Sequence, residues 1–119
     1  MMLAPIQLGA TIIYMARFSP VGALGAIREH KVSLMFGVPS MYAAMAHLKN
    51  ASPSDFSSIY AMISGGEPLP SALRERFQQR FGQPLLEGYG LTETSPVVSL
   101  NVPQDQRPGS VGKPLPGVQ

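Results

Sequence analysis

Apolar runs typical of β-strands alternate with single helical segments over residues 10–90, and this alternation limits the fold more than any other feature. The strand-like runs occupy residues 11–15, 32–36, 59–63 and 84–87, where apolar side chains predominate. Strands separated by one helix usually pair in parallel through right-handed crossover connections. The pattern therefore predicts an α/β fold with a mainly parallel sheet and alternating helices.

Helix signals mark the segments between these runs. Ser19 and Pro20 suit a helix N-cap and first turn, and Gly82 suits a C-terminal cap. Apolar side chains three or four residues apart would share one face of each helix. They are Val21, Leu24 and Ile27 in the first helix, Met41, Met45 and Leu48 in the second, and Leu73, Phe77 and Phe81 in the third. Residues 97–100 are read as one more short strand, before a tail rich in Pro and Gly at 101–119.

Composition excludes several classes of function. Charged residues make up 13% of the chain, and the net charge of +2 comes from basic residues that do not cluster, so no nucleic-acid patch is predicted. The absence of cysteine excludes disulfides, thiolate metal sites and cysteine nucleophiles. The apolar start, residues 1–16, is shorter than the about 20 residues that a transmembrane helix needs. We therefore expect a buried loop and strand there, and no transmembrane segment.

Two glycine-containing strings follow the third and fourth strand-like runs: the Gly-Gly string, Ser64–Pro70, and the Tyr-Gly string, Glu87–Pro96. In the second, Gly88 and Gly90 permit positive φ and a close backbone approach, and the segment is expected to turn. Ligands bind at the carboxyl ends of parallel strands, so both strings are predicted to lie at one site. Taken alone, they would also suit a glycine turn and a helix cap.

Three side chains of the Tyr-Gly string have chemistry suited to a nucleotide. Tyr89 offers a flat apolar face with a polar tip. The hydroxyl of Thr92 can donate to a phosphate oxygen. The carboxylate of Glu93 is an oxygen ligand suited to Mg²⁺, which is usually shared between one or two carboxylates and substrate phosphates.

The Tyr-Gly string resembles the Tyr-Gly-x-Thr-Glu signature of the adenylate-forming (AMP-binding) superfamily, and the Gly-Gly string resembles its Gly-Gly-Glu-Pro segment. Residues 36–42 and 109–114 are similar to two further segments of that superfamily. The resemblance covers essentially the whole chain and is closest to fatty acyl-CoA synthetases and acyl-acyl-carrier-protein synthetases. It implies an internal fragment, a partial subdomain of the large N-terminal domain of such an enzyme.

The resemblance implies a role for each candidate residue. Members form an acyl-adenylate from a carboxylate and ATP, and most then pass the acyl group to a thiol. Thr92 and Glu93 would be catalytic, Thr92 on the α-phosphate and Glu93 as the Mg²⁺ ligand, while Tyr89 would stack on the adenine. The other nucleotide-binding residues would be Gly65, Gly66, Glu67, Pro68, Glu87, Gly88, Gly90 and Leu91, and residues 88–91 would also form one wall of the acyl pocket.

The resemblance implies partners but leaves alternatives open. The substrate would be a small carboxylate, with a fatty acid expected, and the acceptor would be coenzyme A or, alternatively, acyl carrier protein. An aryl- or amino-acid-activating domain is a further alternative. A cytoplasmic enzyme is implied, with membrane association of the full-length protein left open. The superfamily's phosphate loop and catalytic lysine have no counterpart in this sequence, so the chain alone is not expected to complete the reaction. The alternative from a different class of function is a non-catalytic fragment that only binds a nucleotide.

Overall fold

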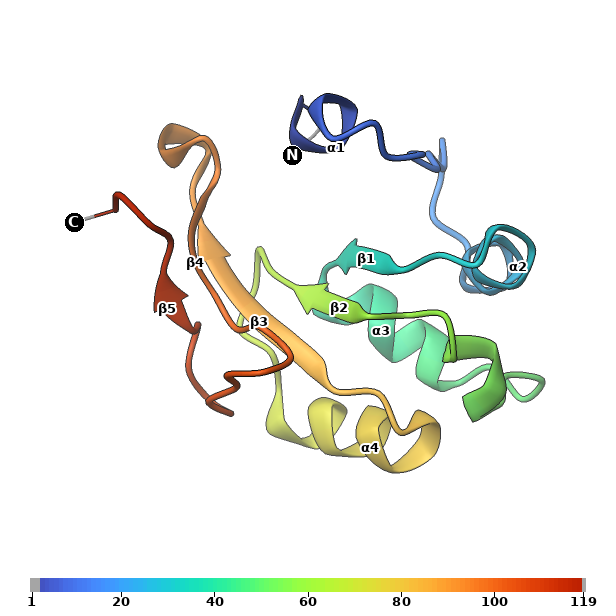
Figure 1. The fold of residues 1–119 in the computed structure, drawn as a ribbon. Coiled ribbons are helices and arrows are strands. Elements are labelled where there is room, and N and C mark those ends of the chain that lie inside the picture. Colours follow the sequence, from blue (N-terminus) through green and yellow to red (C-terminus); the bar gives the residue numbers. More distant parts are fainter. Residues whose placement is uncertain (1–2, 119) are drawn as a thin grey trace.

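The computed structural model describes residues 3–118 and contains a five-stranded sheet in the order β1-β2-β3-β4-β5 (Figure 1). Strands β1 (Leu34–Gly37), β2 (Ala61–Ser64) and β3 (Leu85–Gly90) pair in parallel. The short strand predicted at residues 97–100 is present as β4 (Val97–Leu100). With β5 (Lys113–Pro114) it forms an antiparallel edge, and neither this orientation nor β5 was predicted. The α/β class with parallel strands and alternating helices is confirmed.

Three helices alternate with the parallel strands, as predicted: α2 (Pro20–His30), α3 (Pro39–Ala46) and α4 (Ser71–Phe81). The shorter helical elements are α1 (Leu3–Gln7) and the 3₁₀ helices η1 (Pro53–Phe56) and η2 (Thr92–Thr94). The three longer helices and η1 contribute, with β2 and β3, to one hydrophobic cluster. The helices therefore cover one face of the parallel strands (Figure 1).

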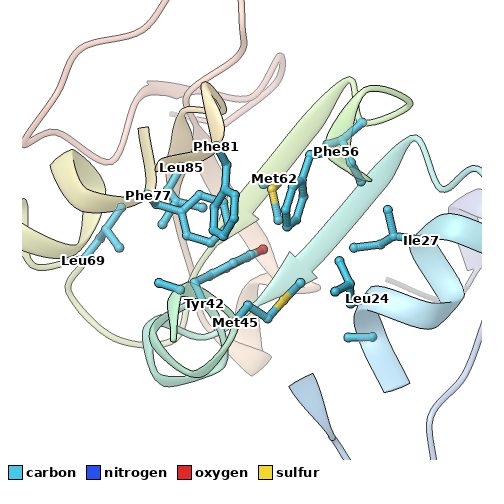
Figure 2. Packing of buried hydrophobic residues seen from close by; sticks show 13 residues of the cluster. Leu24, Ile27, Tyr42, Met45, Phe56, Met62, Leu69, Phe77, Phe81 and Leu85 are labelled. Atoms are coloured by element: carbon cyan, nitrogen blue, oxygen red, sulfur yellow. The ribbon is translucent and has the colours of Figure 1, made fainter. Parts of the chain in front are cut away.

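Aromatic side chains form the centre of this main core, as Figure 2 shows. Phe77 is fully buried and its ring centroid lies 5.9 Å from that of Tyr42, 5.8 Å from that of Phe56 and 4.8 Å from that of Phe81. The Tyr42 hydroxyl lies 2.8 Å from the carbonyl oxygen of Ile63, to which it donates, so the core also ties α3 to β2. Burial raises the pKa of Tyr42, and the ring stays a neutral hydrogen-bond donor.

Local signals place the helix ends where the sequence predicts them. The Ser19 side chain accepts a hydrogen bond from the Gly22 amide at 3.3 Å, and Gly82 has the left-handed φ of 69° that ends α4. Arg28 of α2 donates to both carboxylate oxygens of Asp55 in η1, at 2.8 and 2.9 Å. This guanidinium holds the pKa of Asp55 well below its usual range.

The start of the chain departs from its prediction. Residues 11–15 form no strand, and Ile13, Tyr14 and Met15 are 37%, 65% and 39% exposed. A segment with high β-propensity forms a strand only when it can pair with a neighbouring strand, and none of the described strands pairs with this segment. The expected buried loop is also wrong, since residues 4–10 lie in α1 and the turn after it and are mostly exposed; Met1 and Met2 lie outside the described residues. Across residues 3–118, no helix has the length and apolar character required to cross a bilayer.

The opposite face of the sheet has a smaller cluster made of strand residues alone. Ala61, Ile63 and Leu86 are buried there, with Leu100 packed against them. On the edge strand β1, Phe36 pairs with Ile63 across the same face and is 46% exposed. Among the described residues no helix contributes to this cluster, so apolar side chains on this face remain open.

Candidate functional site

A groove of about 310 Å³ lies at the carboxyl ends of the three parallel strands. Its walls come from the ends of β1, β2 and β3, from the segments that follow β1 and β2, and from both ends of β4 with the residue before it. The lining consists of glycines and apolar or aromatic side chains: Phe36, Gly37, Val38, Ile63, Gly65, Gly66, Gly88, Tyr89, Gly90, Pro96, Val97 and Leu100. Both predicted strings therefore border one groove, as the topology requires.

The Gly-Gly string brings bare backbone to this groove. The Gly65 amide donates to the Gly37 carbonyl at 3.1 Å, which continues the sheet pairing beyond β2. Gly66 has a φ of +81°, a conformation that favours glycine. A Cβ atom on Gly65 would lie 3.5 Å from the Gly88 carbonyl oxygen, so the two strings are in contact. Glu67 and Pro68 are exposed and lie outside the groove lining.

The Tyr-Gly string is a strand end followed by a hairpin loop, and this corrects the expected glycine turn. β3 continues through Gly90, and neither Gly88 nor Gly90 is among the positive-φ glycines. Close backbone approach is nevertheless required, because a Cβ atom on Gly90 would lie 1.9 Å from the Pro96 carbonyl oxygen. At Gly90 the glycine is needed by the antiparallel pairing of β3 with β4.

The chain reverses at residues 91–96, which carry two of the candidate side chains. The Leu91 amide donates to the Pro96 carbonyl at 2.9 Å and closes the loop. Thr92 and Glu93 lie in η2, and both are exposed to solvent beyond the end of β3. Tyr89, just before the loop, is 46% exposed and lines the groove. The loop thus presents a hydroxyl and a carboxylate beside an apolar groove.

Sequence reasoning missed Thr94, which organises this loop. Its hydroxyl oxygen accepts from the Leu91 amide at 3.0 Å and lies 2.8 Å from the carbonyl oxygens of both Leu91 and Pro96. The next residue, Ser95, takes a left-handed φ of 63°. A Thr followed by Ser-Pro after a strand is a turn signal of the kind that side-chain hydroxyls stabilise, and it could have identified this residue.

Glu87 is directed away from the groove. Its Oε1 accepts from the Leu69 amide and its Oε2 from Nη2 of Arg74, each at 3.1 Å. The side chains of Arg74 and Glu87 are 18% and 12% exposed. Asn101 adds to this arrangement by donating its amide to the Glu87 carbonyl oxygen at 2.9 Å. Arg74 and Asn101 were missed, because no local pattern shows which side chains meet across a helix, a strand and a loop.

The model of the AMP-binding enzyme family matches residues 1–119. The chain belongs to this family of AMP-binding enzymes. It is 38% identical to a long-chain-fatty-acid–CoA ligase of Bacillus subtilis (strain 168), over 93% of the present chain and 20% of that protein. The present AMP-binding chain thus spans about a fifth of the length of the curated relatives it matches.

Solved structures support the membership of this AMP-binding chain. A benzoate CoA ligase from Burkholderia xenovorans LB400 is 34% identical with a TM-score of 0.83, over 95% of the present chain and 23% of that protein. O-succinylbenzoate coenzyme A synthetase from Bacillus subtilis, in complex with ATP and magnesium ion, is 32% identical with a TM-score of 0.80. The match covers 93% of the present chain and 23% of that protein. The superfamily predicted from the two strings and the fold class predicted from the alternation of strands and helices are confirmed.

The residues that the structure describes in this AMP-binding chain form no cluster of metal-ligating side chains. Within residues 3–118, no group of three or more His, Asp or Glu side chains is placed to hold a metal ion. Glu93 stands alone on its loop as an exposed carboxylate. Such a donor set fits a Mg²⁺ ion that takes most of its ligands from nucleotide phosphates and water, and does not fit a permanently bound ion.

Proposed function

We propose that this chain provides the nucleotide and acyl groove of an ATP-dependent acid–thiol ligase, which forms an acyl-adenylate and then a thioester. The observation that carries the proposal is the shared groove, which joins the Gly-Gly string and the Tyr-Gly string at the carboxyl ends of three parallel strands. Family membership supports the reaction class. The chain is proposed as one part of the catalytic unit, and its activity alone is expected to be absent.

ATP would bind with its base on the Tyr89 ring, beside the exposed backbone of Gly65 and Gly66. Stacking on an aromatic face contributes roughly 0.5–1.5 kcal/mol beyond area burial. Thr92 would donate its hydroxyl to the α-phosphate from the loop that Thr94 holds. Glu93 would be the protein's ligand for Mg²⁺, which neutralises phosphate charge when it is bound. Positioning and charge stabilisation of this kind are the main requirements of adenylyl transfer.

The acyl group would lie against the apolar part of the groove. Its lining includes Phe36, Ile63, Val97 and Leu100, and residues 88–90 provide a glycine-containing wall. We propose a fatty acid as the substrate, consistent with the long-chain-fatty-acid–CoA ligase among the relatives. An aromatic acid is the second candidate, because a benzoate CoA ligase is among the similar structures. Coenzyme A is the proposed acceptor, since these relatives are named as coenzyme A ligases.

A hybrid ligase tests the proposal. The present chain replaces the matching segment of the Bacillus subtilis long-chain-fatty-acid–CoA ligase, and carboxylate-dependent ATP–pyrophosphate exchange is measured with fatty and aromatic acids. We expect exchange with the hybrid and a preference for fatty acids. The unmodified relative is the control for folding and assay conditions. A folded hybrid without exchange would contradict the proposed function, while a preference for benzoate would favour the second candidate.

Two neighbouring variants of the hybrid separate metal from phosphate binding. Glu93→Gln keeps the shape and removes the charge, so exchange should require a higher Mg²⁺ concentration. Thr92→Val removes one hydrogen bond to a charged group, worth roughly 1.5–3 kcal/mol, which is about one to two decades in rate. Its Mg²⁺ requirement should stay that of the parent. If Glu93→Gln left both the rate and the Mg²⁺ requirement unchanged, the metal role would be wrong.

A further inference from the structure

The Gly-Gly string has no capping side chain of its own at the start of α4. The residue before this helix is Pro70, which offers no side-chain acceptor, and the first turn of α4 contains no acidic residue. A carboxylate from β3 reaches this region instead: Glu87 accepts from the Leu69 amide, just before the N-cap residue, and from the Arg74 guanidinium. One carboxylate thus joins the end of the Gly-Gly string and the first turns of α4 to the strand that carries the Tyr-Gly string.

The environment makes this connection stronger than an exposed ion pair. Both side chains are largely shielded from water, at 18% and 12% exposure, and each carboxylate oxygen has its own donor. Leu69 itself is buried in the main core at 6% exposure, so its side chain anchors the same residue whose amide donates to Glu87. Charge-assisted hydrogen bonds with two donors fix geometry better than a single contact.

We call the contacts of Glu87 with the Leu69 amide and with Arg74 the clamp. Its position in the sheet places it next to the groove. Ser64, the last residue of β2, is in register with Glu87 on β3, so the clamp lies one residue before the point where both strings enter the groove. The following residues, Gly65 and Gly88, are in contact through backbone. Glu87 points to the helix side of the sheet, and it is absent from the groove lining. Its influence on a nucleotide would therefore act through the backbone of the Gly-Gly string.

We propose that Glu87 and Arg74 are positioning residues, which fix the Gly-Gly string against β3 and so set the affinity for the nucleotide base. This inference rests on the proposed function. It assigns Glu87 an indirect role in place of the direct nucleotide contact expected from sequence. Glu87→Gln removes the charge and replaces one of the two acceptor oxygens with an NH₂ donor group, which would then face Arg74 or the Leu69 amide. The Gly-Gly string should therefore be held less firmly against β3.

The first test measures the clamp directly, without any reaction. Amide hydrogen exchange at Leu69 is followed in the 119-residue chain and in its Glu87→Gln variant. Exchange at Leu69 should become at least about tenfold faster, while the Met62 amide in β2 keeps the parent's rate. Glu75→Gln is the matched control, because it makes the same chemical change on an exposed residue of α4. An unchanged rate at Leu69 would overturn the clamp.

The second test uses the hybrid ligase and separates positioning from general stability. Glu87→Gln should raise the KM for ATP about tenfold, which corresponds to roughly 1.4 kcal/mol, and should weaken the preference for ATP over GTP. The KM for the carboxylate should stay that of the parent. The control variant Glu75→Gln should leave the KM for ATP and the KM for the carboxylate unchanged. Equal losses for ATP and carboxylate, or a lower Tm alone, would overturn the positioning role. A parent hybrid without exchange would contradict the proposed function, and the Leu69 measurement would still decide the clamp.

Discussion

The two faces of the sheet differ in what their residues do. On the helix-covered face, Tyr42, Phe56 and Phe77 are fully buried and form a close aromatic cluster. On the opposite face, the strand cluster is small, Leu34 and Phe36 are 48% and 46% exposed, and the groove opens at the strand ends. The difference indicates that one face supplies stability and the other presents surface to a ligand, although both use the same three strands.

The contrast breaks down if the core face can lose an aromatic ring without cost, so the first prediction addresses Phe77. Phe77→Ala should lower the free energy of unfolding by about 3–5 kcal/mol, because it removes a fully buried ring and leaves a cavity. Leu34→Ala on the open face, at a side chain that is 48% exposed, should change it by less than about 1 kcal/mol. Urea unfolding of the two variants provides the measurement. Similar losses for both would show that the faces do not differ in this way.

The second prediction concerns the pairing of β3 with β4, a part of the sheet that both faces share. Gly90→Ala should destabilise the chain by about 1–3 kcal/mol, because the added methyl group would collide with the Pro96 carbonyl. Gly25→Ala should act in the opposite direction, stabilising by about 0.5–1 kcal/mol, because Gly25 lies inside α2 with open space around it. Thermal unfolding of both variants distinguishes a packed glycine from a free one. Stabilisation by Gly90→Ala would contradict the tight hairpin.

The third and smallest effect is a pH dependence on the helix-covered side. Since Arg28 lowers the pKa of Asp55 in the folded chain, the pair contributes stability above the usual carboxyl pKa of about 3.9. That contribution should be lost as the pH falls from there through the lowered pKa. Asp55→Asn should therefore be less stable than the parent at neutral pH, with the difference shrinking in acid. Glu29→Gln, an exposed change on α2, is the control, and a constant difference across the pH range would argue against the pair.

The parts of this fold that could be predicted from sequence are those with local causes. Ser19 caps α2, Gly82 ends α4, and the spacing of Phe77 and Phe81 places both in the core, because each signal acts within one or two turns of helix. Val21 was placed on the buried stripe and is 60% exposed, because a stripe predicts a helix face but not how far the core extends. Whether a segment forms a strand depends instead on whether a partner strand lies beside it. Residues 11–15 have strand propensity without a partner, and β5 is a strand only because β4 lies beside it.

The candidate site divides in the same way. That both strings meet at one groove follows from strand order, and family membership agrees with the motif reading. The direction of the Glu87 side chain does not follow from sequence, because the same residue type suits a ligand contact and an internal clamp. Its contacts with Leu69 and Arg74 depend on how α4 packs against β3. The closed loop around Thr94 was missed for a different reason: its contacts are local, but the nearby glycines suggested a turn earlier in the chain.

The loop of residues 91–96 has a consequence for the order of folding. β3 and β4 are joined by this loop alone, whereas β1, β2 and β3 must wait for helices to cross between them. Hairpins form in about 1–10 μs, and pairings between distant segments come later because closing long loops costs entropy. We therefore expect the loop carrying Thr92 and Glu93 to acquire its shape early, before the opposite wall of the groove exists. Time-resolved exchange labelling would test this, with early protection expected at Leu91 and late protection at Gly65.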